Sequence, residues 1–300
     1  MKYLIIAGTE KSGTTSVFQY LGSHPSVSNS IRKETDYFRN NNKVEMSEYL
    51  KHFKIKNDTK ILVEASPGYL ADSEKVTRKI QNTIPEAYLL FILRDPIERL
   101  ISSFKFHKSR LNISDKLSFE SYLQLCFEYE KTNKVFDTSL SEWQLRVPGS
   151  GLYAKKLAEY YKYFDENKIL IMTHDYLKNN PQKFMTRICD WIDIDSSFYD
   201  NYIFNKSNVT FDHKFDYIQK LALNLNKKFE PLFIRFPYTK RQLLKLYKII
   251  NKKNTTKKRI DKNTEEVLRK YYEDDLKELA KLVETEDILK LNWLSRTYEQ

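Results

Sequence analysis

Short apolar runs alternate with amphipathic stretches along the first two thirds of the chain. Unbroken apolar runs at 3–8 and 88–93 are typical of parallel strands that are buried on both faces, and shorter runs predict strands at 26–30, 60–64 and 168–172. Hydrophobic residues at helical spacing predict helices at about 14–22, 73–83, 96–108, 118–130 and 151–164. This order predicts an α/β fold with a small parallel sheet flanked by helices.

The last third of the chain is patterned differently, because from about residue 213 onward the signal is almost wholly helical. No repeat and no Pro/Gly-rich linker separates this part from the rest. We therefore expect residues 1–300 to form one domain, in which 213–300 is a mostly helical C-terminal subregion. The length of 300 residues and the 41% hydrophobic content are sufficient for one full core.

The net charge is +11, and basic residues concentrate in 240–259. A basic segment can bind an anionic partner such as a membrane surface or a nucleic acid. A helix at 240–253 would carry apolar residues on one face and basic residues on another. We expect it to dock on the core with its basic face in water, and peripheral contact with an anionic membrane is the alternative. Tyr247 is the only aromatic residue in 240–259, so the run does not favour nucleic acid.

The first strand leads into a small polar loop, Gly8–Thr15, and then into a helix. This architecture binds phosphate, because backbone N–H groups and the helix dipole both face the anion. A nucleoside triphosphate loop carries its lysine directly after the second glycine. Here Gly8 and Gly13 have the required spacing, but position 14 is Thr and the lysine is Lys11. The loop therefore predicts a phosphate site that fits ATP or GTP poorly.

A second candidate site follows the strand at 88–93. Arg94 comes at the carboxyl end of that strand, where open α/β sheets place ligand contacts. Asp95 can cap the next helix, Pro96 suits its first position, and Glu98 completes a capping box. The planar fork of an arginine donates two hydrogen bonds to phosphate oxygens, so this position suits a second phosphate. A buried arginine at the sheet edge is the structural alternative.

Together these motifs resemble those of sulfotransferases that use 3′-phosphoadenosine 5′-phosphosulfate (PAPS). The run Lys11–Thr15 is similar to their 5′-phosphosulfate loop, and the spacing of Arg94 and Ser102 is similar to their 3′-phosphate site. Other segments resemble carbohydrate sulfotransferases such as the heparan sulfate enzymes, namely 32–38, 63–69, 151–153 and 268–279. The resemblance covers nearly the whole chain and implies a P-loop-like three-layer fold.

The resemblance also implies roles for individual residues in holding the donor. Lys11 would contact the leaving phosphate, and the loop around it would supply Ser12, Gly13, Thr14, Thr15 and Ser16. Arg94 and Ser102 would clasp the 3′-phosphate. A late basic loop that covers the cofactor would fall at Lys257, Lys258 and Arg259, with a solvated surface run as the alternative reading.

The acceptor needs a general base, and the resemblance implies that Glu34 is this base. The alternative for Glu34 is a surface carboxylate that pairs with Arg32 or Lys33. Small-molecule sulfotransferases use a histidine instead, which makes His107 the second candidate. We expect the remaining histidines to be structural or surface residues, with His24 the only one near the site; they are His24, His52, His174 and His213.

The implied reaction moves a sulfuryl group from PAPS to a hydroxyl or amine of a glycan, a glycolipid or a small metabolite, with 3′-phosphoadenosine 5′-phosphate (PAP) as product. Asp36 and Ala65 stand where carbohydrate enzymes carry histidine and lysine, so the resemblance does not imply an identical acceptor. The rival functions are a P-loop-type kinase, which would need a lysine at position 14, and a non-catalytic basic binding protein.

Cofactor and location expectations follow from what the sequence contains. The sequence has no cluster of cysteines and histidines, so we expect no metal site. We expect Cys126 and Cys189 to be reduced packing residues. The apolar start, Met1–Ala7, is too short for a signal peptide, and no apolar run approaches the ~18 residues of a membrane span. We expect a cytoplasmic protein, with a peripheral membrane location as the alternative.

Overall fold

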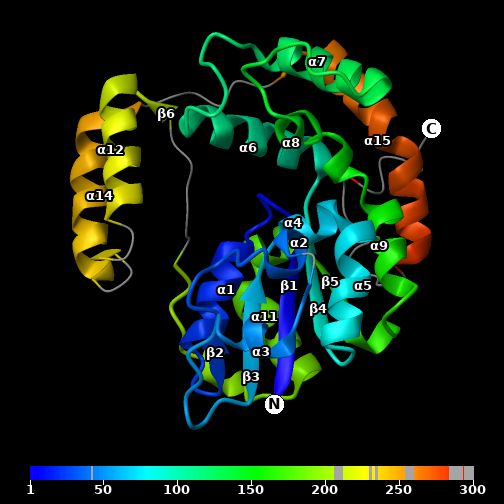
Figure 1. Ribbon diagram of the computed structural model, residues 1–300, viewed down its shortest axis with the longest axis vertical. Coiled ribbons are helices and arrows are strands. Elements are labelled where there is room, and N and C mark those ends of the chain that lie inside the picture. The colour runs from blue at the N-terminus through cyan, green and yellow to red at the C-terminus, as the bar shows by residue number, and fades with distance from the viewer. Residues whose placement is uncertain are drawn as a thin grey trace. The chain divides into compact units, whose positions relative to one another are not determined.

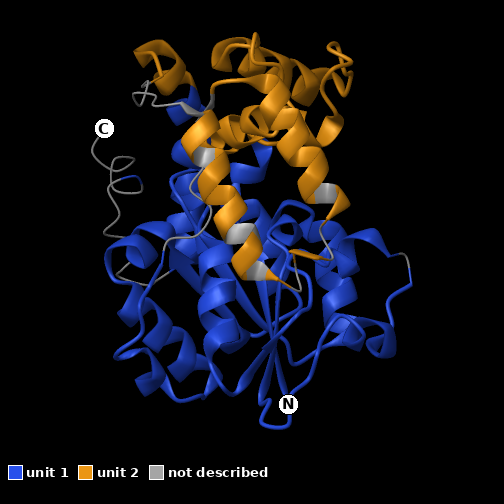
Figure 2. Ribbon diagram, turned by 90° about the vertical axis from the view of Figure 1, so that its left-hand side faces the viewer, with its two compact units in different colours: residues 1–99, 149–208, 268–300 blue, residues 100–148, 209–267 orange. Residues whose placement is uncertain are grey.

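The computed structural model describes residues 1–41, 43–205, 212–229, 232–233, 236–253, 260–283 and 293. They form two compact units, each assembled from separate stretches of the chain (Figure 2). The first unit comprises 1–99, 149–208 and 268–300, and the second comprises 100–148 and 209–267. The expected single domain over 1–300 stays a prediction.

The first unit is built on a five-stranded parallel sheet (Figure 1). The strand order is β2-β3-β1-β4-β5, and every neighbouring pair is parallel. Each predicted strand is confirmed to within one residue at either end. The strands are β1 Lys2–Gly8, β2 Val27–Asn29, β3 Ile61–Ala65, β4 Tyr88–Leu93 and β5 Ile169–Thr173.

Helices connect these strands and cover both faces of the sheet (Figure 1). Most belong to the first unit: α1 Thr14–Ser23, α2 Tyr37–Asn40, α3 Met46–Leu50, α4 Gly68–Ala71, α5 Ser73–Thr83, α9 Tyr153–Tyr161, α10 His174–Asn179 and α11 Pro181–Ile192. Two helices run from one unit into the other, α6 Pro96–Ser109 and α15 Lys262–Leu282.

The alternation of side chains along the strands explains the three layers. Leu4 and Ile6 of β1 share an apolar cluster with Val17 of α1 and Ile188 of α11 on one face. On the other face, the ring of Phe91 in β4 packs edge-on against Tyr160 of α9, with ring centroids 4.8 Å apart. The α/β fold with a parallel sheet between helical layers is therefore confirmed.

Within its described residues, the second unit has helices and one short strand pair. Tyr122 lies at its centre, where its ring is 5.1 Å from Phe104 and its hydroxyl donates to the Gln144 carbonyl at 2.5 Å. The elements wholly inside this unit are α7 Phe119–Thr132, α8 Glu142–Leu145, β6 Asp212–His213, α12 Asp216–Lys228, α14 Pro237–Asn251 and β7 Lys252–Lys253. The helical character predicted for residues after 213 is confirmed in the described ranges.

The basic helix predicted at 240–253 is present as α14, but one expectation about it is wrong. Its apolar face was expected to dock on the core, yet Leu243, Leu246 and Ile250 are 50%, 57% and 50% exposed. Among the described residues, no helix is both long enough and apolar enough to cross a lipid bilayer.

Candidate functional site

The candidate site lies where the parallel strands of the first unit end. The polar loop Thr9–Gly13 follows β1, Arg94 follows β4 and His174 follows β5. Strand β3 lies beside β1, and Glu34 lies at its end, where the Glu34 N–H donates to the Ala65 carbonyl at 2.9 Å. Neighbouring strands lie only about 4.8 Å apart, so one edge of the sheet gathers these residues.

The loop after β1 is held by its own polar groups. The Thr9 N–H donates to the Ile92 carbonyl at 3.0 Å, and the Thr9 and Ser12 hydroxyls lie 2.6 Å apart. Lys11 and Gly13 have φ angles of 66° and 90°, in the left-handed region. The φ angle of Gly13 strains any residue with a side chain, and an added Cβ would also come 2.7 Å from a methyl carbon of Leu177, so this position favours glycine.

Helix α1 begins directly after this loop, and its N-terminus faces no side-chain cap. The Gly13 carbonyl accepts from the N–H groups of Ser16 and Val17, which start the helical ladder. The N–H groups of Thr14 and Thr15, which precede them, have no acceptor within the helix. Together with the positive end of the helix dipole, these N–H groups could hold an anion such as a phosphate group.

Arg94 lies against this loop, and its role in binding phosphate stays a prediction. Its Nη1 donates to the Lys11 carbonyl at 3.1 Å, and its Nη2 donates to Glu98 Oε2 at 2.7 Å. The buried Tyr153 hydroxyl donates to the Arg94 carbonyl at 2.8 Å, so Tyr153 is a packing residue. Burial raises the pKa of Tyr153 to about 12, which keeps this hydroxyl a donor.

His174 also belongs to this edge, although the sequence analysis set it aside as structural or surface. Its Cδ2 lies 3.5 Å from where a Gly13 Cβ would be. Burial, followed by the positive charge of Arg94, lowers the pKa of His174 to about 4. The one sequence signal was its place directly after β5. His24 lies instead at the far end of α1, where its Nε2 is 2.9 Å from the Asp195 carbonyl.

A buried carboxyl group, Glu64 in β3, organises the turn that carries Glu34. Its Oε1 accepts three hydroxyl donors at 2.6 to 2.7 Å, from Thr35, Ser66 and Tyr69. Each hydroxyl in turn accepts one backbone N–H, and these come from the three successive residues Asp36, Tyr37 and Phe38. Those N–H groups begin helix α2, so Glu64 acts through the hydroxyls as the cap of that helix.

Glu34 itself is held by its backbone but has an accessible side chain. Glu34 and Asp36 have φ angles of 64° and 50°, and such strained residues persist only where their surroundings fix them. The Glu34 side chain is 55% exposed, and its Oε1 accepts from Lys33 Nζ at 2.5 Å. This ion pair is the one that the alternative reading of Glu34 predicts. Both the base role and the surface role stay open.

The remaining predicted site residues are not part of the first unit's described residues. Ser102 and His107 belong to the second unit, on α6, and their proposed roles stay predictions. His107 is buried, and its ring packs edge-on against Trp143 at 4.8 Å. Lys257, Lys258 and Arg259 lie outside the described residues.

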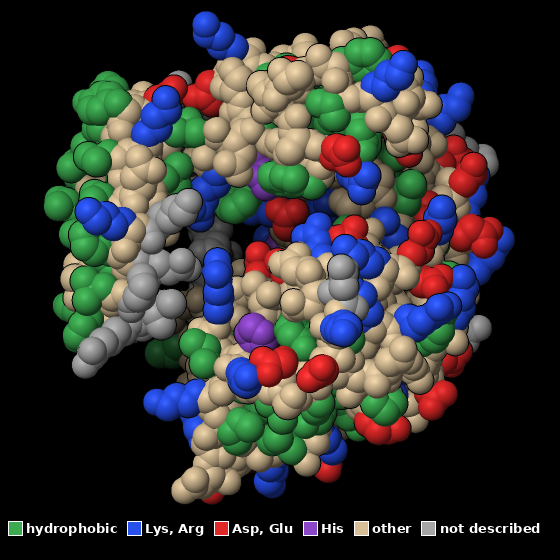
Figure 3. Space-filling view, viewed as in Figure 1, with side chains coloured by type: hydrophobic (Ala, Val, Ile, Leu, Met, Phe, Trp, Pro, Cys, Tyr) green, Lys and Arg blue, Asp and Glu red, His purple; other side chains and the backbone are tan. Residues whose placement is uncertain are grey.

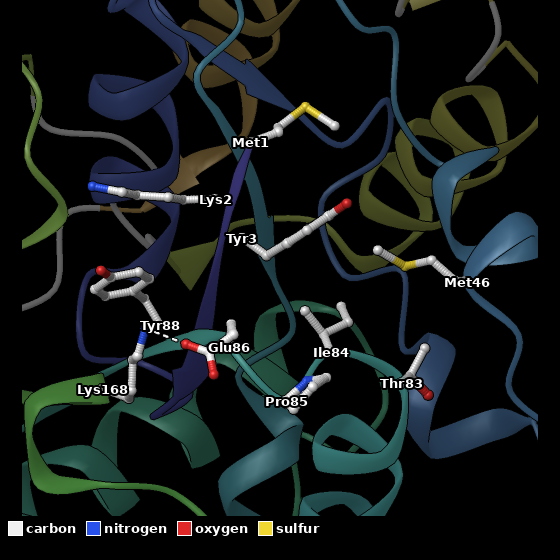
Figure 4. Close-up of a pocket in the computed structure, with 10 residues that line it drawn as sticks. All are labelled: Met1, Lys2, Tyr3, Met46, Thr83, Ile84, Pro85, Glu86, Tyr88 and Lys168. Atoms are coloured by element: carbon white, nitrogen blue, oxygen red, sulfur yellow. Dashed lines mark ion pairs between the residues drawn. The ribbon is translucent and has the colours of Figure 1, made fainter.

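A separate depression of 320 Å³ opens at the opposite edge of the sheet, where β1, β4 and β5 begin (Figure 4). Within it Lys168 Nζ pairs with Glu86 Oε2 at 2.8 Å. Its lining is Met1, Lys2, Tyr3, Met46, Thr83, Ile84, Pro85, Glu86, Tyr88 and Lys168. Because it lies at the amino ends of the strands, it is not part of the candidate site.

Comparison with known proteins identifies the family. A family model described as a sulfotransferase domain matches residues 2–280. The chain belongs to the sulfotransferase family. A solved sulfotransferase from Alicyclobacillus acidocaldarius matches 99% of this sulfotransferase and 99% of its own chain, with a TM-score of 0.67 and 16% identity. That likeness supports the fold alone.

The curated relatives match a smaller part of the chain. The heparan sulfate glucosamine 3-O-sulfotransferase 3B1 of Homo sapiens is 26% identical over 68% of this chain and 49% of its own length. The bifunctional heparan sulfate N-deacetylase/N-sulfotransferase 1 of Caenorhabditis briggsae is 24% identical over 64% and 22%. The membrane-associated sulfotransferase kil1 of Dictyostelium discoideum is 36% identical over 34% and 22%. The matched segment therefore spans about half or less of each of these relatives.

Replacing Glu64 should destabilise the first unit. In Glu64→Leu three buried hydroxyls lose their acceptor, so we expect the free energy of unfolding to fall by about 2–4 kcal/mol. Glu64→Gln keeps one acceptor oxygen and should cost less. Urea unfolding at pH 7 measures both, with Glu86→Gln, whose carboxylate is 80% exposed, as the control. Equal stability of Glu64→Leu and the control would contradict the capping role of Glu64.

His174 should make stability depend on pH. Between its ordinary pKa of 6.5 and its folded value of about 4, the unfolded chain binds a proton that the folded chain does not. This contribution to stability is complete above pH 6.5 and is lost as the pH falls through that window. Urea unfolding at pH 7 and pH 5 should show a smaller loss for His174→Asn than for the natural chain. An identical loss in both proteins would be inconsistent with a buried, neutral His174.

Proposed function

We propose that this chain is a PAPS-dependent sulfotransferase that acts on a hydroxyl or amine of a glycan, a glycolipid or a small metabolite. The observation that carries the proposal is the uncapped N-terminus of α1 behind the Lys11 loop, with Arg94 3.1 Å from the Lys11 carbonyl. Family membership supports the reaction class. The glycan acceptor is suggested by relatives whose names specify heparan sulfate.

In the proposed site the loop binds the phosphate that becomes the leaving group. PAPS, when bound, supplies the sulfuryl group, and PAP is the product. Lys11 and the N–H groups at the start of α1 neutralise negative charge at the 5′-phosphate oxygens, which is the charge that grows during transfer. Because a lysine and backbone amides supply this neutralisation, donor binding should not require Mg²⁺. The residues proposed to line the phosphate are Ser12, Gly13, Thr14, Thr15 and Ser16.

Arg94 is proposed to hold the second phosphate of the donor. A guanidinium has five N–H donors, of which the contacts with Lys11 and Glu98 use two. The contact with the Lys11 carbonyl fixes the guanidinium beside the loop, so both phosphates of one donor can meet cations. Ser102 is the hydroxyl partner that the resemblance implies, and Lys257, Lys258 and Arg259 are the proposed cover.

Glu34 is proposed to accept the proton of the acceptor group as the new S–O or S–N bond forms and the bond from sulfur to the phosphate oxygen breaks. Its accessible carboxylate on a rigid turn suits this task, because a base must reach an external substrate. Lys33 would have to release the carboxylate or share it with the acceptor. His107 is the alternative base.

Removing either cation should weaken donor binding. A charge-assisted hydrogen bond to phosphate contributes about 1.5–3 kcal/mol, so Lys11→Ala and Arg94→Ala should each raise the dissociation constant of PAP by about tenfold or more. Equilibrium dialysis with labelled PAP measures this change. Lys51→Ala and Arg78→Ala remove exposed cations elsewhere in the first unit and should leave it unchanged. Normal binding by both site variants would exclude this loop as the donor site.

Glu34→Gln should separate binding from transfer. It removes the proposed base but no donor contact, so we expect PAP binding within about twofold of the natural chain and a rate of transfer lowered by about 10²–10⁴. Transfer of labelled sulfate from PAPS to desulfated heparan oligosaccharides is the assay, with Glu48→Gln as the surface control. Retained turnover in Glu34→Gln would move the base role to His107, and the same assay on His107→Asn would then test that residue.

A further inference from the structure

Helices α12 and α14 of the second unit pack against each other through polar groups. The Tyr247 hydroxyl donates to Gln219, and Asn251 Nδ2 donates to the Tyr247 hydroxyl at 3.1 Å. Asn251 Oδ1 accepts from the Phe215 N–H at 2.8 Å, and Asn251 Nδ2 also reaches the Phe215 carbonyl at 3.2 Å. Gln219 and Asn251 are buried. Amide and phenol groups therefore form the contact at this end of the α12–α14 hairpin (216–251).

Large apolar side chains lie on the outside of the same hairpin. On α12, Tyr217, Leu221 and Leu225 follow one another at four-residue spacing and are 70%, 58% and 44% exposed. On α14 the exposed large apolar residues are Tyr238, Leu243, Leu244, Leu246, Ile249 and Ile250. Figure 3 shows hydrophobic side chains gathered over both helices. The hairpin therefore exposes large apolar side chains on both helices while it buries the polar groups of Gln219 and Asn251.

Basic residues accompany the apolar ones. Between Lys214 and Asn251 the sequence has nine lysines and arginines and only two acidic residues, a net charge of +7. Lys220, Lys228 and Lys245 are exposed on the same two helices. A surface that is both apolar and strongly positive is complementary to the interface of a bilayer that contains anionic lipids.

The dimensions fit a helix that lies on a membrane and does not span it. Helix α14 has 15 residues, which corresponds to a length of about 22 Å. That is short of the ~30 Å hydrocarbon core. Nucleic acids or polyanionic glycans could use the positive charge, but they would leave the leucines and isoleucines in water. The apolar residues therefore favour lipid over either polyanion.

We propose that the α12–α14 hairpin docks this sulfotransferase on the surface of a membrane that contains anionic lipid. Tyr217, Leu221, Leu246 and Ile249 enter the boundary between headgroups and acyl chains, and Lys220 and Lys245 contact the lipid phosphates. The proposal does not depend on the donor site, because it rests on the hairpin alone. A membrane-docked enzyme would meet acceptors that are themselves anchored in lipid.

Vesicle co-sedimentation of the full chain tests this docking. The chain should pellet with vesicles of phosphatidylcholine and phosphatidylglycerol, pellet less as salt is added, and stay in solution with phosphatidylcholine alone. Leu246→Asp combined with Ile249→Asp should weaken vesicle binding at least about tenfold. Ile203→Asp is the matched control, because Ile203 of the first unit is exposed to the same 78% as Ile249.

Circular dichroism and PAP binding of each variant check that the fold and the donor site are intact. Failure of PAP binding with normal vesicle binding would reject the proposed function and leave the docking surface standing. Absence of vesicle binding, equal binding to neutral vesicles, or equal loss in the Ile203→Asp control would each overturn the docking proposal. Heparin or single-stranded DNA could also bind the basic residues. If either polyanion displaces the chain from vesicles, and the Leu246→Asp, Ile249→Asp variant is displaced equally, the basic residues bind a polyanion and the lipid proposal is rejected.

Discussion

The first unit depends on one buried carboxyl group. Glu64 has no exposed surface, and three hydroxyls donate to one of its oxygens. Because those hydroxyls accept the first N–H groups of α2, the turn before this helix keeps two residues in the left-handed region, Glu34 and Asp36. All three contacts reach Oε1, whereas the buried Oε2 accepts no hydrogen bond among the described residues. A buried hydrogen-bond network of this kind holds its members in one arrangement. The accessible carboxylate of Glu34 therefore projects from a turn that has little freedom to move.

The same edge of the sheet carries the groups from which the donor site is proposed. The start of α1 carries no side-chain cap, the Arg94 guanidinium lies against the Lys11 carbonyl, and the positive charge of Arg94 helps to hold His174 neutral. Glu98 forms an ion pair with Arg94 at 2.7 Å. Uncapped helix N–H groups and a guanidinium with further donors would both gain from a bound anion, and this is the basis for the proposed donor site.

The sequence was informative where local rules dominate. Strands came from apolar runs, the Lys11 loop from its glycine spacing, and the Asp95 cap from the residues around Pro96; Asp95 Oδ1 does accept from the N–H groups of Ile97 and Glu98. Features that depend on distant residues could not be foreseen. Glu64 meets hydroxyls from 35 to 69, and His174 reaches Gly13 only because the sheet brings β5 near β1. The exposed face of α14 was also hidden, because amphipathic spacing defines a face but not what covers it.

The central claim is that the loop between β1 and α1 binds the phosphates of a sulfuryl donor without metal. Calorimetric titration of the whole chain tests this most directly, with PAP in the presence of a chelator and with ATP in the presence of Mg²⁺. The structure predicts one PAP per chain, bound without metal and at least about tenfold more tightly than ATP with Mg²⁺. Preference for ATP with Mg²⁺, or no binding of PAP at all, would contradict the account.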